Sequence, residues 1–214
     1  MRNYGRVINI KAHLTEVATQ KGTVTDLLQF PECEIDPESI KVIMISEVPP
    51  KNPEDSFYSK APNPDYMKTT LGLFEKAGVR VKSIQDILDL GIYITTAVKA
   101  PKTGYAVDTD VVKAHLHILE AELALFPNLK VIMLMGDVAK KAVNMIAKAR
   151  TKKNIIPSES TYKIRGNEYF WGDIRVFPSY IITGGNILIE KSKCEMIADD
   201  IRRMMALISG SHNN

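Results

Sequence analysis

The chain has few cysteines and histidines and no long apolar segment. Its 214 residues include two cysteines and four histidines. Two cysteines far apart in sequence cannot form a disulfide framework, and with no signal peptide they indicate a reducing compartment, the cytoplasm. No apolar run approaches the roughly 20 residues that a membrane-spanning helix needs, so we expect no membrane partner.

Strong charge and nucleotide-binding glycine patterns are also absent. The formal net charge is only +3, which permits an acidic partner such as nucleic acid but does not argue for one. No P-loop or dinucleotide-binding glycine pattern occurs. His115 and His117 stand two apart in a predicted helix and therefore point in different directions. We expect no metal site and no other cofactor.

What remains is the composition of an ordinary globular protein. Hydrophobic residues make up 45% of the chain and charged residues 25%, as in soluble domains. The length suffices for one domain with a full core. We predict a single domain over residues 1–208, a monomer, and a polar, disordered tail over residues 209–214.

Four segments are predicted to be strands: residues 41–47, 92–98, 131–136 and 174–178. The first and third contain continuous apolar runs, which are typical of parallel strands buried on both faces. Helices are predicted over residues 8–30, 65–77, 108–126, 137–149 and 192–208. This alternation predicts an α/β fold, a three-layer α/β/α sandwich with a central four-stranded parallel sheet.

Two long loops and two strand ends carry the candidate functional residues. The loops span residues 48–64 and 151–171, and long loops in compact domains are often functional. Ligands bind at the carboxyl ends of the strands in an open parallel sheet. We therefore expect the end of the first strand and the end of the last to converge on one pocket. They carry Glu47 on one side, and Ser179, Tyr180, Thr183, Gly184 and Gly185 on the other.

Four short motifs follow these strands in order. They are Ser-Glu-Val-Pro-Pro at 46–50, Tyr-Ile-Thr-Thr-Ala-Val-Lys-Ala at 93–100, Met-Gly-Asp-Val-Ala at 135–139 and Phe-Pro-Ser-Tyr at 177–180. They are similar to Gly-Glu-Ala-Pro-Gly, Tyr-Ile-Thr-Asn-x-Val-Lys-Cys, Leu-Gly-Arg-Val-Ala and His-Pro-Ser of one family. Over roughly residues 41–207 the chain thus resembles the uracil-DNA glycosylase superfamily, nearest to its family 4.

The chain also departs from the family pattern. The family's asparagine that reads the uracil edge falls on Thr96, and its histidine before Pro-Ser falls on Phe177. The glycines of the first motif fall on Ser46 and Pro50. Family 4 members usually hold a four-iron-four-sulfur cluster through four cysteines. Since this chain has only two cysteines, an iron-sulfur cluster is excluded on ligand count.

The resemblance implies a DNA-repair hydrolase that flips out a damaged base and cleaves its N-glycosidic bond, with uracil as the leading candidate for that base. Glu47 and Ser179 would be the catalytic residues, with Glu47 favouring the positive charge that builds on the sugar. The partner would be DNA containing a damaged base. Ser46, Phe57, Tyr58, Thr96 and Phe177 would contact the base, and Tyr180, Thr183, Gly184, Gly185 and Asn186 would contact the DNA.

Other interpretations remain open at this point. The changes at Thr96 and Phe177 favour a binding module that holds nucleic acid or a nucleotide without efficient cleavage. An enzyme for hypoxanthine or xanthine is a third alternative. Each of these residues also fits a purely structural role. Glu47 would then be a solvated loop residue, Ser179 a turn cap, and Phe57 and Tyr58 anchors of their loop.

Overall fold

A five-stranded sheet forms the centre of the molecule. The computed structural model describes residues 6–184, 187 and 189–210. The strand order is β4-β3-β5-β7-β6. Four strands run parallel: β3 (Val42–Ser46), β4 (Ile92–Thr96), β5 (Val131–Met135) and β7 (Ile174–Ser179). The four predicted parallel strands are confirmed, but the sheet has a fifth, β6 (Tyr169–Trp171), antiparallel to β7.

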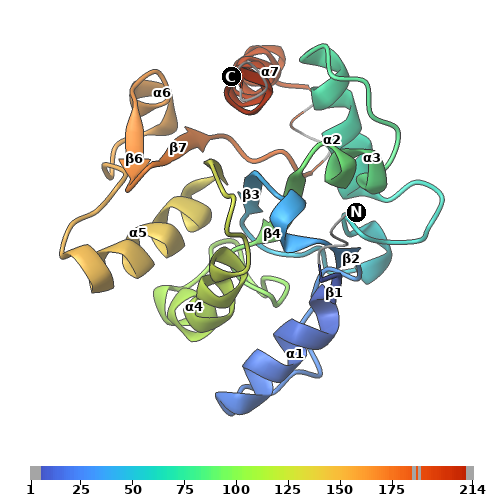
Figure 1. Ribbon diagram of the computed structural model, residues 1–214, viewed down its shortest axis with the longest axis vertical. Coiled ribbons are helices and arrows are strands. Elements are labelled where there is room, and N and C mark those ends of the chain that lie inside the picture. Colours follow the sequence, from blue (N-terminus) through green and yellow to red (C-terminus); the bar gives the residue numbers. More distant parts are fainter. Residues whose placement is uncertain (1–5, 185–186, 188, 211–214) are drawn as a thin grey trace.

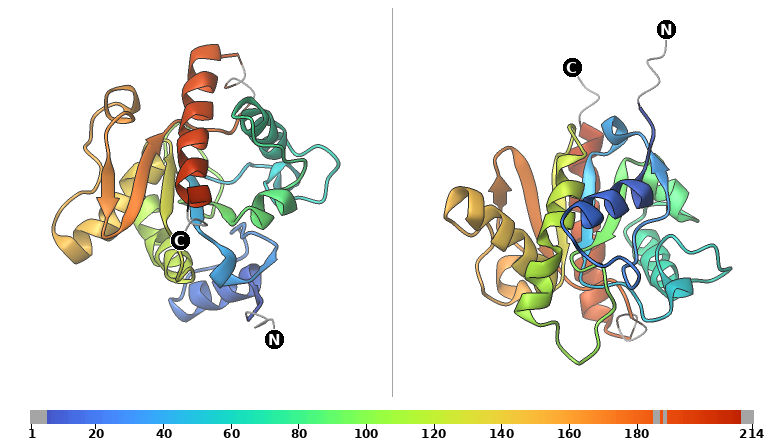
Figure 2. Two further views of the ribbon diagram at one scale, coloured as in Figure 1. Left: turned by 45° about the horizontal axis from the view of Figure 1, so that its top comes forward. Right: turned by 90° about the horizontal axis from the view of Figure 1, so that it is seen from below.

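Helices cover both faces of this sheet, as Figures 1 and 2 show. One face packs against α1 (Ile10–Gln20), α4 (Thr109–Ala124) and α5 (Asp137–Thr151). The other packs against α2 (Asp65–Lys76), α3 (Ile84–Asp89) and α7 (Lys191–Ser209). Every residue of β3, β4 and β5 is buried, because alternate side chains enter the two helical layers. The α/β class and the mostly parallel sheet between helices are therefore confirmed.

The amino-terminal region differs most from expectation. The helix predicted over residues 8–30 ends at Gln20, where Gly22 takes a left-handed φ of 71° and its N–H bonds to Thr19. A glycine after the last turn is a common helix stop. Two short strands, β1 (Ile8–Asn9) and β2 (Glu34–Ile35), pair antiparallel on either side of this region. Within the segment between them, the backbone N–H of Gln29 donates to the carbonyl of Lys99, just after β4.

Shorter elements occupy the two long loops. The first loop contains a 3-10 turn, η2 (Pro53–Asp55), and the second contains α6 (Thr161–Ile164) and β6. Another 3-10 turn, η1 (Pro37–Ser39), precedes β3. Helix α7 continues to Ser209, so it includes the first residue of the predicted tail, while residues 211–214 lie outside the described part of the chain. Across the described residues, no helix has both the length and the apolar character for a membrane crossing.

A buried polar network ties β4 to α4. The Lys99 ammonium and the Glu122 carboxylate form an ion pair, and both side chains are fully buried. Tyr93 and Thr95 donate their hydroxyls to Glu122 at 2.6 and 2.7 Å. Lys99 also donates to the carbonyl of Thr96 at 2.6 Å. A buried ion pair is tolerated only with such additional hydrogen bonds, so this network fixes the carboxyl end of β4 against the helical layer.

Candidate functional site

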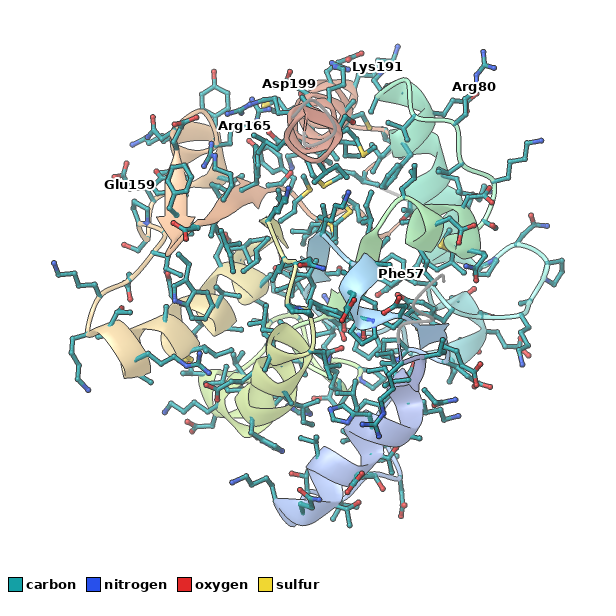
Figure 3. The ribbon with its side chains drawn as sticks, in the orientation of Figure 1. Phe57, Arg80, Glu159, Arg165, Lys191 and Asp199 are labelled. Carbon is teal, nitrogen blue, oxygen red and sulfur yellow. The ribbon has the colours of Figure 1, made fainter. Side chains whose placement is uncertain are left out.

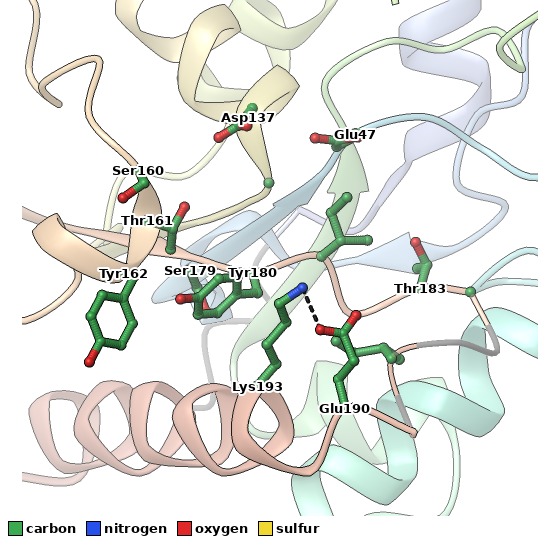
Figure 4. A pocket seen from close by; sticks show the side chains of 14 residues that line it. Glu47, Asp137, Ser160, Thr161, Tyr162, Ser179, Tyr180, Thr183, Glu190 and Lys193 are labelled. Carbon is green, nitrogen blue, oxygen red and sulfur yellow. Dashed lines mark ion pairs between the residues drawn. The ribbon is translucent and has the colours of Figure 1, made fainter. Parts of the chain in front are cut away.

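A cleft of about 580 Å³ opens at the carboxyl ends of the parallel strands. Figure 4 shows it bordered by the end of β3, the start of α5, the segment after β7 and the start of α7. Its lining residues are Glu47, Gly136, Asp137, Ser160, Thr161, Tyr162, Ser179, Tyr180, Ile181, Thr183, Gly184, Ile187, Glu190 and Lys193. The structure therefore brings Glu47 and Ser179 to one cleft, as the two strand ends predict.

Glu47 is half-buried and bonded to the start of α5. Its Oε1 accepts the backbone N–H of Val138 at 3.1 Å. The N-cap residue of α5 is Gly136, which has no side chain to serve as a cap, so Glu47 satisfies one of the free N–H groups from outside the helix. Burial raises the pKa of Glu47, while the Val138 N–H opposes this by favouring the carboxylate. The side chain thus combines a structural contact with exposure to the cleft.

Gly136 allows the Glu47 carboxylate to lie against the backbone. Its φ is 106°, a conformation that L side chains rarely adopt. A Cβ at this position would overlap the Glu47 carboxyl group and would lie 2.7 Å from Cγ1 of Ile181. Gly136 therefore makes room for the Glu47 carboxylate in the wall of the cleft, because any larger residue at this position would displace it.

We expect Gly136→Ala to lower the free energy of unfolding by about 2 kcal/mol or more, through backbone strain and overlap with Glu47. Urea unfolding followed by circular dichroism measures the change. Gly166→Ala is the matched control, since nothing lies within 4 Å of a Cβ there and its φ is not left-handed. Equal midpoints for the two variants would show that the Glu47 carboxyl group moves aside at little cost.

Ser179 is joined to a buried carboxylate that the sequence patterns did not reveal. Its hydroxyl donates to Oδ2 of Asp200 at 2.7 Å, and Asp200 is fully buried. Arg165 donates to Oδ1 of Asp200 at 2.8 Å and to Asp199 at 3.1 Å. Figure 3 labels Arg165 next to Asp199 of α7. Burial raises the pKa of Asp200, against the contributions of Ser179 and Arg165.

A signal for this cluster was present in the sequence. Asp200 follows Ile197 by three residues and precedes Met204 by four, so it lies on the apolar stripe of α7. A charged residue on such a stripe needs a buried partner. The partner of Asp200, Arg165, lies in the second long loop, beyond the reach of any periodic pattern.

The remaining side chains of the segment after β7 give the cleft its polar character. Tyr180 and Thr183 bring hydroxyls to the lining. Lys193 forms an ion pair with Glu190 at 2.6 Å, drawn in Figure 4, and its Nζ lies 5.8 Å from the centre of the Tyr180 ring. Gly184 lines the cleft with a φ of 96°. The predicted contacts at Gly185 and Asn186 fall outside the described residues.

Two predicted base contacts lie in the core instead of the cleft. Phe177 is 2% exposed, and the guanidinium groups of Arg175 and Arg203 lie 4.5 and 5.3 Å from its ring centre. Ser46 is fully buried and lies on the same side of β3 as Val42 and Met44, which belong to the core on the side of α2 and α7. Both side chains point into the helical layer because alternate residues of a strand face opposite sides. Neither reaches the cleft in this structure.

Phe57, Tyr58 and Thr96 line a separate cavity of only about 40 Å³, together with Gln29, Phe30 and Pro31. Phe57 packs in the core against Tyr66, with ring centres 5.2 Å apart, and is 4% exposed. The Tyr58 hydroxyl donates to the carbonyl of Ile94 at 2.8 Å and accepts its N–H at 3.3 Å. Thr96, predicted as a base contact, therefore lines a different cavity from Glu47 and Ser179.

Within the described residues, no group of three or more histidine, cysteine or acidic side chains is placed to hold a metal ion. In comparisons with known proteins, no family model matches the sequence and no curated protein resembles it significantly.

Proposed function

We propose that the chain is a DNA-repair glycosylase that hydrolyses the N-glycosidic bond of a damaged base, with uracil as the leading candidate for that base. The observation that carries this proposal is the cleft shared by Glu47 and Ser179. The half-buried carboxylate of Glu47 follows a parallel strand and lines the cleft, and the hydrogen bond that it accepts from the Val138 N–H fixes its orientation. Glycosidic cleavage needs such a group, because positive charge builds on the sugar in the transition state.

The other parts of the reaction would come from neighbouring residues. Negative charge on the departing base requires hydrogen-bond donors. The Ser179 hydroxyl already donates its hydrogen bond to Asp200, and the side chain is fully buried, so we assign Ser179 a positioning role in the wall of the cleft. Tyr180 and Thr183, in the segment after β7, bring hydroxyl donors to the lining of the cleft. Glu47 would act on the sugar and on the attacking water.

A binding module remains the second candidate. The residue at the position of the family's histidine, Phe177, is buried beside Arg175 and Arg203 and brings no donor to the cleft. A glycosylase-like site without that histidine would hold a flipped nucleotide yet cleave it slowly. The two candidates differ in turnover and share DNA binding.

A single-turnover assay separates them. Oligonucleotides carrying one uracil, hypoxanthine or xanthine are incubated with excess protein, and abasic sites are scored by alkaline cleavage. Undamaged strands serve as the control, in single- and double-stranded form. We expect abasic sites on at least the uracil strand. Saturable binding by fluorescence anisotropy without abasic sites on any substrate would favour the binding module.

A further inference from the structure

A groove of about 790 Å³ lies on the helical layer that contains α2 and α3. It runs between the end of the first long loop, one side of α2 and the segment that leads into α3. Its volume falls in the range of about 300–1,000 Å³ that is usual for binding pockets. The groove shares no lining residue with the cleft that holds Glu47, so an occupant of the groove would leave the cleft open.

The floor of the groove is an edge of the hydrophobic core. Phe57 and Met67 belong to that core and are buried. Leu71, Val81 and Ile84 pack against it and remain partly exposed to the groove. An occupant with apolar side chains would therefore gain free energy by covering this floor.

Gly72 keeps the α2 wall of the groove open. It stands inside α2, its φ is not left-handed, and a Cβ there would meet no atom within 4 Å. Glycine inside a helix costs stability relative to alanine, and no contact with the described residues requires it at this position. What the missing side chain does provide is close access to the backbone of α2 from the groove.

The rim of the groove is basic. Lys68, Arg80 and Lys82 are exposed, and none of them forms an ion pair with a described residue. Figure 3 shows Arg80 extending away from the ribbon. Glu75 is the single carboxylate among the lining residues. A positive rim above an apolar floor complements a chain that carries both negative and apolar side chains.

We propose that this groove binds an acidic, amphipathic segment of a partner protein. Its apolar side chains would cover Leu71 and Val81, and its aspartate or glutamate side chains would pair with the basic rim. A nucleic acid fits less well, because phosphates gain nothing from an aliphatic floor. Phe57, the single ring among the lining residues, is only 4% exposed and offers no face for base stacking. Such binding requires no catalytic activity in the cleft.

A display library of random short peptides, panned on the full chain, tests this surface. Gly72→Leu serves for counter-selection, because its side chain enters open space in the groove and leucine is a good helix former. Urea unfolding checks that this variant keeps its fold. We expect the enriched sequences to combine acidic with apolar residues. The most enriched peptide, synthesised with a fluorescent label, should bind wild type in an anisotropy titration.

Two variants should weaken the binding of this peptide at least about 10-fold. Gly72→Leu fills the groove, and Arg80→Glu/Lys82→Glu places like charges against the peptide. The matched control is Lys148→Glu/Lys153→Glu, which makes the same change in net charge at exposed residues in and after α5; it should bind as wild type does. If Gly72→Leu fails to fold, the charge-reversal variant takes over the counter-selection.

The absence of any enriched sequence, or enrichment of peptides without acidic residues, would overturn the proposal. So would equal affinity of the peptide for wild type and both variants, because the peptide would then bind elsewhere. A fluorescent single-stranded DNA, titrated in parallel, tests the other occupant. If no peptide is enriched and DNA binding falls in Arg80→Glu/Lys82→Glu but not in the control, the groove belongs to nucleic acid and the proposal fails.

Discussion

Replacement of Glu47 by glutamine is expected to slow base excision about 100-fold or more, the scale of losing a positioned catalytic group. The glutamine oxygen can still accept the Val138 N–H, so the start of α5 keeps its partner. What disappears is the negative charge. A carboxylate stabilises the cationic transition state more than the neutral ground state, so its loss should appear in the rate.

The matched control is Asp137→Asn. Asp137 lines the same cleft, but its side chain is 88% exposed and pairs with Lys140 at 2.7 Å. We expect it to retain most of the activity. DNA affinity of Glu47→Gln, measured by anisotropy, should not fall, because removing a negative charge does not weaken phosphate binding. Equal single-turnover rates for wild type and Glu47→Gln would remove Glu47 from the mechanism.

The pH profile offers an independent readout of the same group. Burial raises the pKa of Glu47 above its usual value, and the proposed reaction needs the charged form. Excision should therefore decline, as pH falls, at a higher pH than an ordinary glutamate would give. Glu47→Gln should lose this acidic limb of the profile. A wild-type rate with no acidic limb down to pH 4.5, the ordinary value, would contradict a catalytic carboxylate at this position.

Lys99→Met is expected to destabilise the protein by about 3–5 kcal/mol, the cost of leaving one buried charge without its partner. Glu122 would keep the hydroxyls of Tyr93 and Thr95 but would lose its cation. The double variant Lys99→Met/Glu122→Gln should recover most of this loss, since a neutral amide oxygen can still accept both hydroxyls. Urea unfolding measures all three proteins.

Lys113→Met is the control for removing a lysine. Lys113 pairs with Asp110 on the surface of α4, with side chains 59% and 91% exposed. Exposed ion pairs contribute little, so its midpoint should hardly change. Two results would contradict the argument that an unpaired buried charge causes the loss of stability. One is that Lys99→Met lowers the urea midpoint no more than Lys113→Met does. The other is that the double variant is as unstable as Lys99→Met.

Parts of the fold could be predicted because their signals are local. The apolar runs at Val42 and Val131 are buried parallel strands, as their composition indicates. The fifth strand was missed although Gly172-Asp173 stands between Trp171 and Ile174, which pair across the turn. A two-residue loop with glycine is a recognised hairpin signal. Strand β6 has only three residues, too few for an alternation of apolar and polar side chains to indicate a strand.

The placement of the candidate residues could be predicted only where chain direction decides position. Glu47 and Ser179 follow parallel strands, so their strand ends had to lie at one edge of the sheet. The base contacts required knowledge of which face each side chain enters and of what covers it. Arg165 lies at the end of the four-residue helix α6, and Asp200 is recognisable only as a charge on the apolar stripe of α7. No periodic pattern specifies such tertiary neighbours.

The Tyr58 hydroxyl has a consequence for the solubility of the protein. Strand β4 ends the sheet on one side, and its outward backbone groups would template a further strand from another molecule. By bonding both the N–H and the carbonyl of Ile94, the phenol takes the place that a foreign chain would need. A residue expected to stack on a base thus guards the sheet edge against edge-to-edge aggregation.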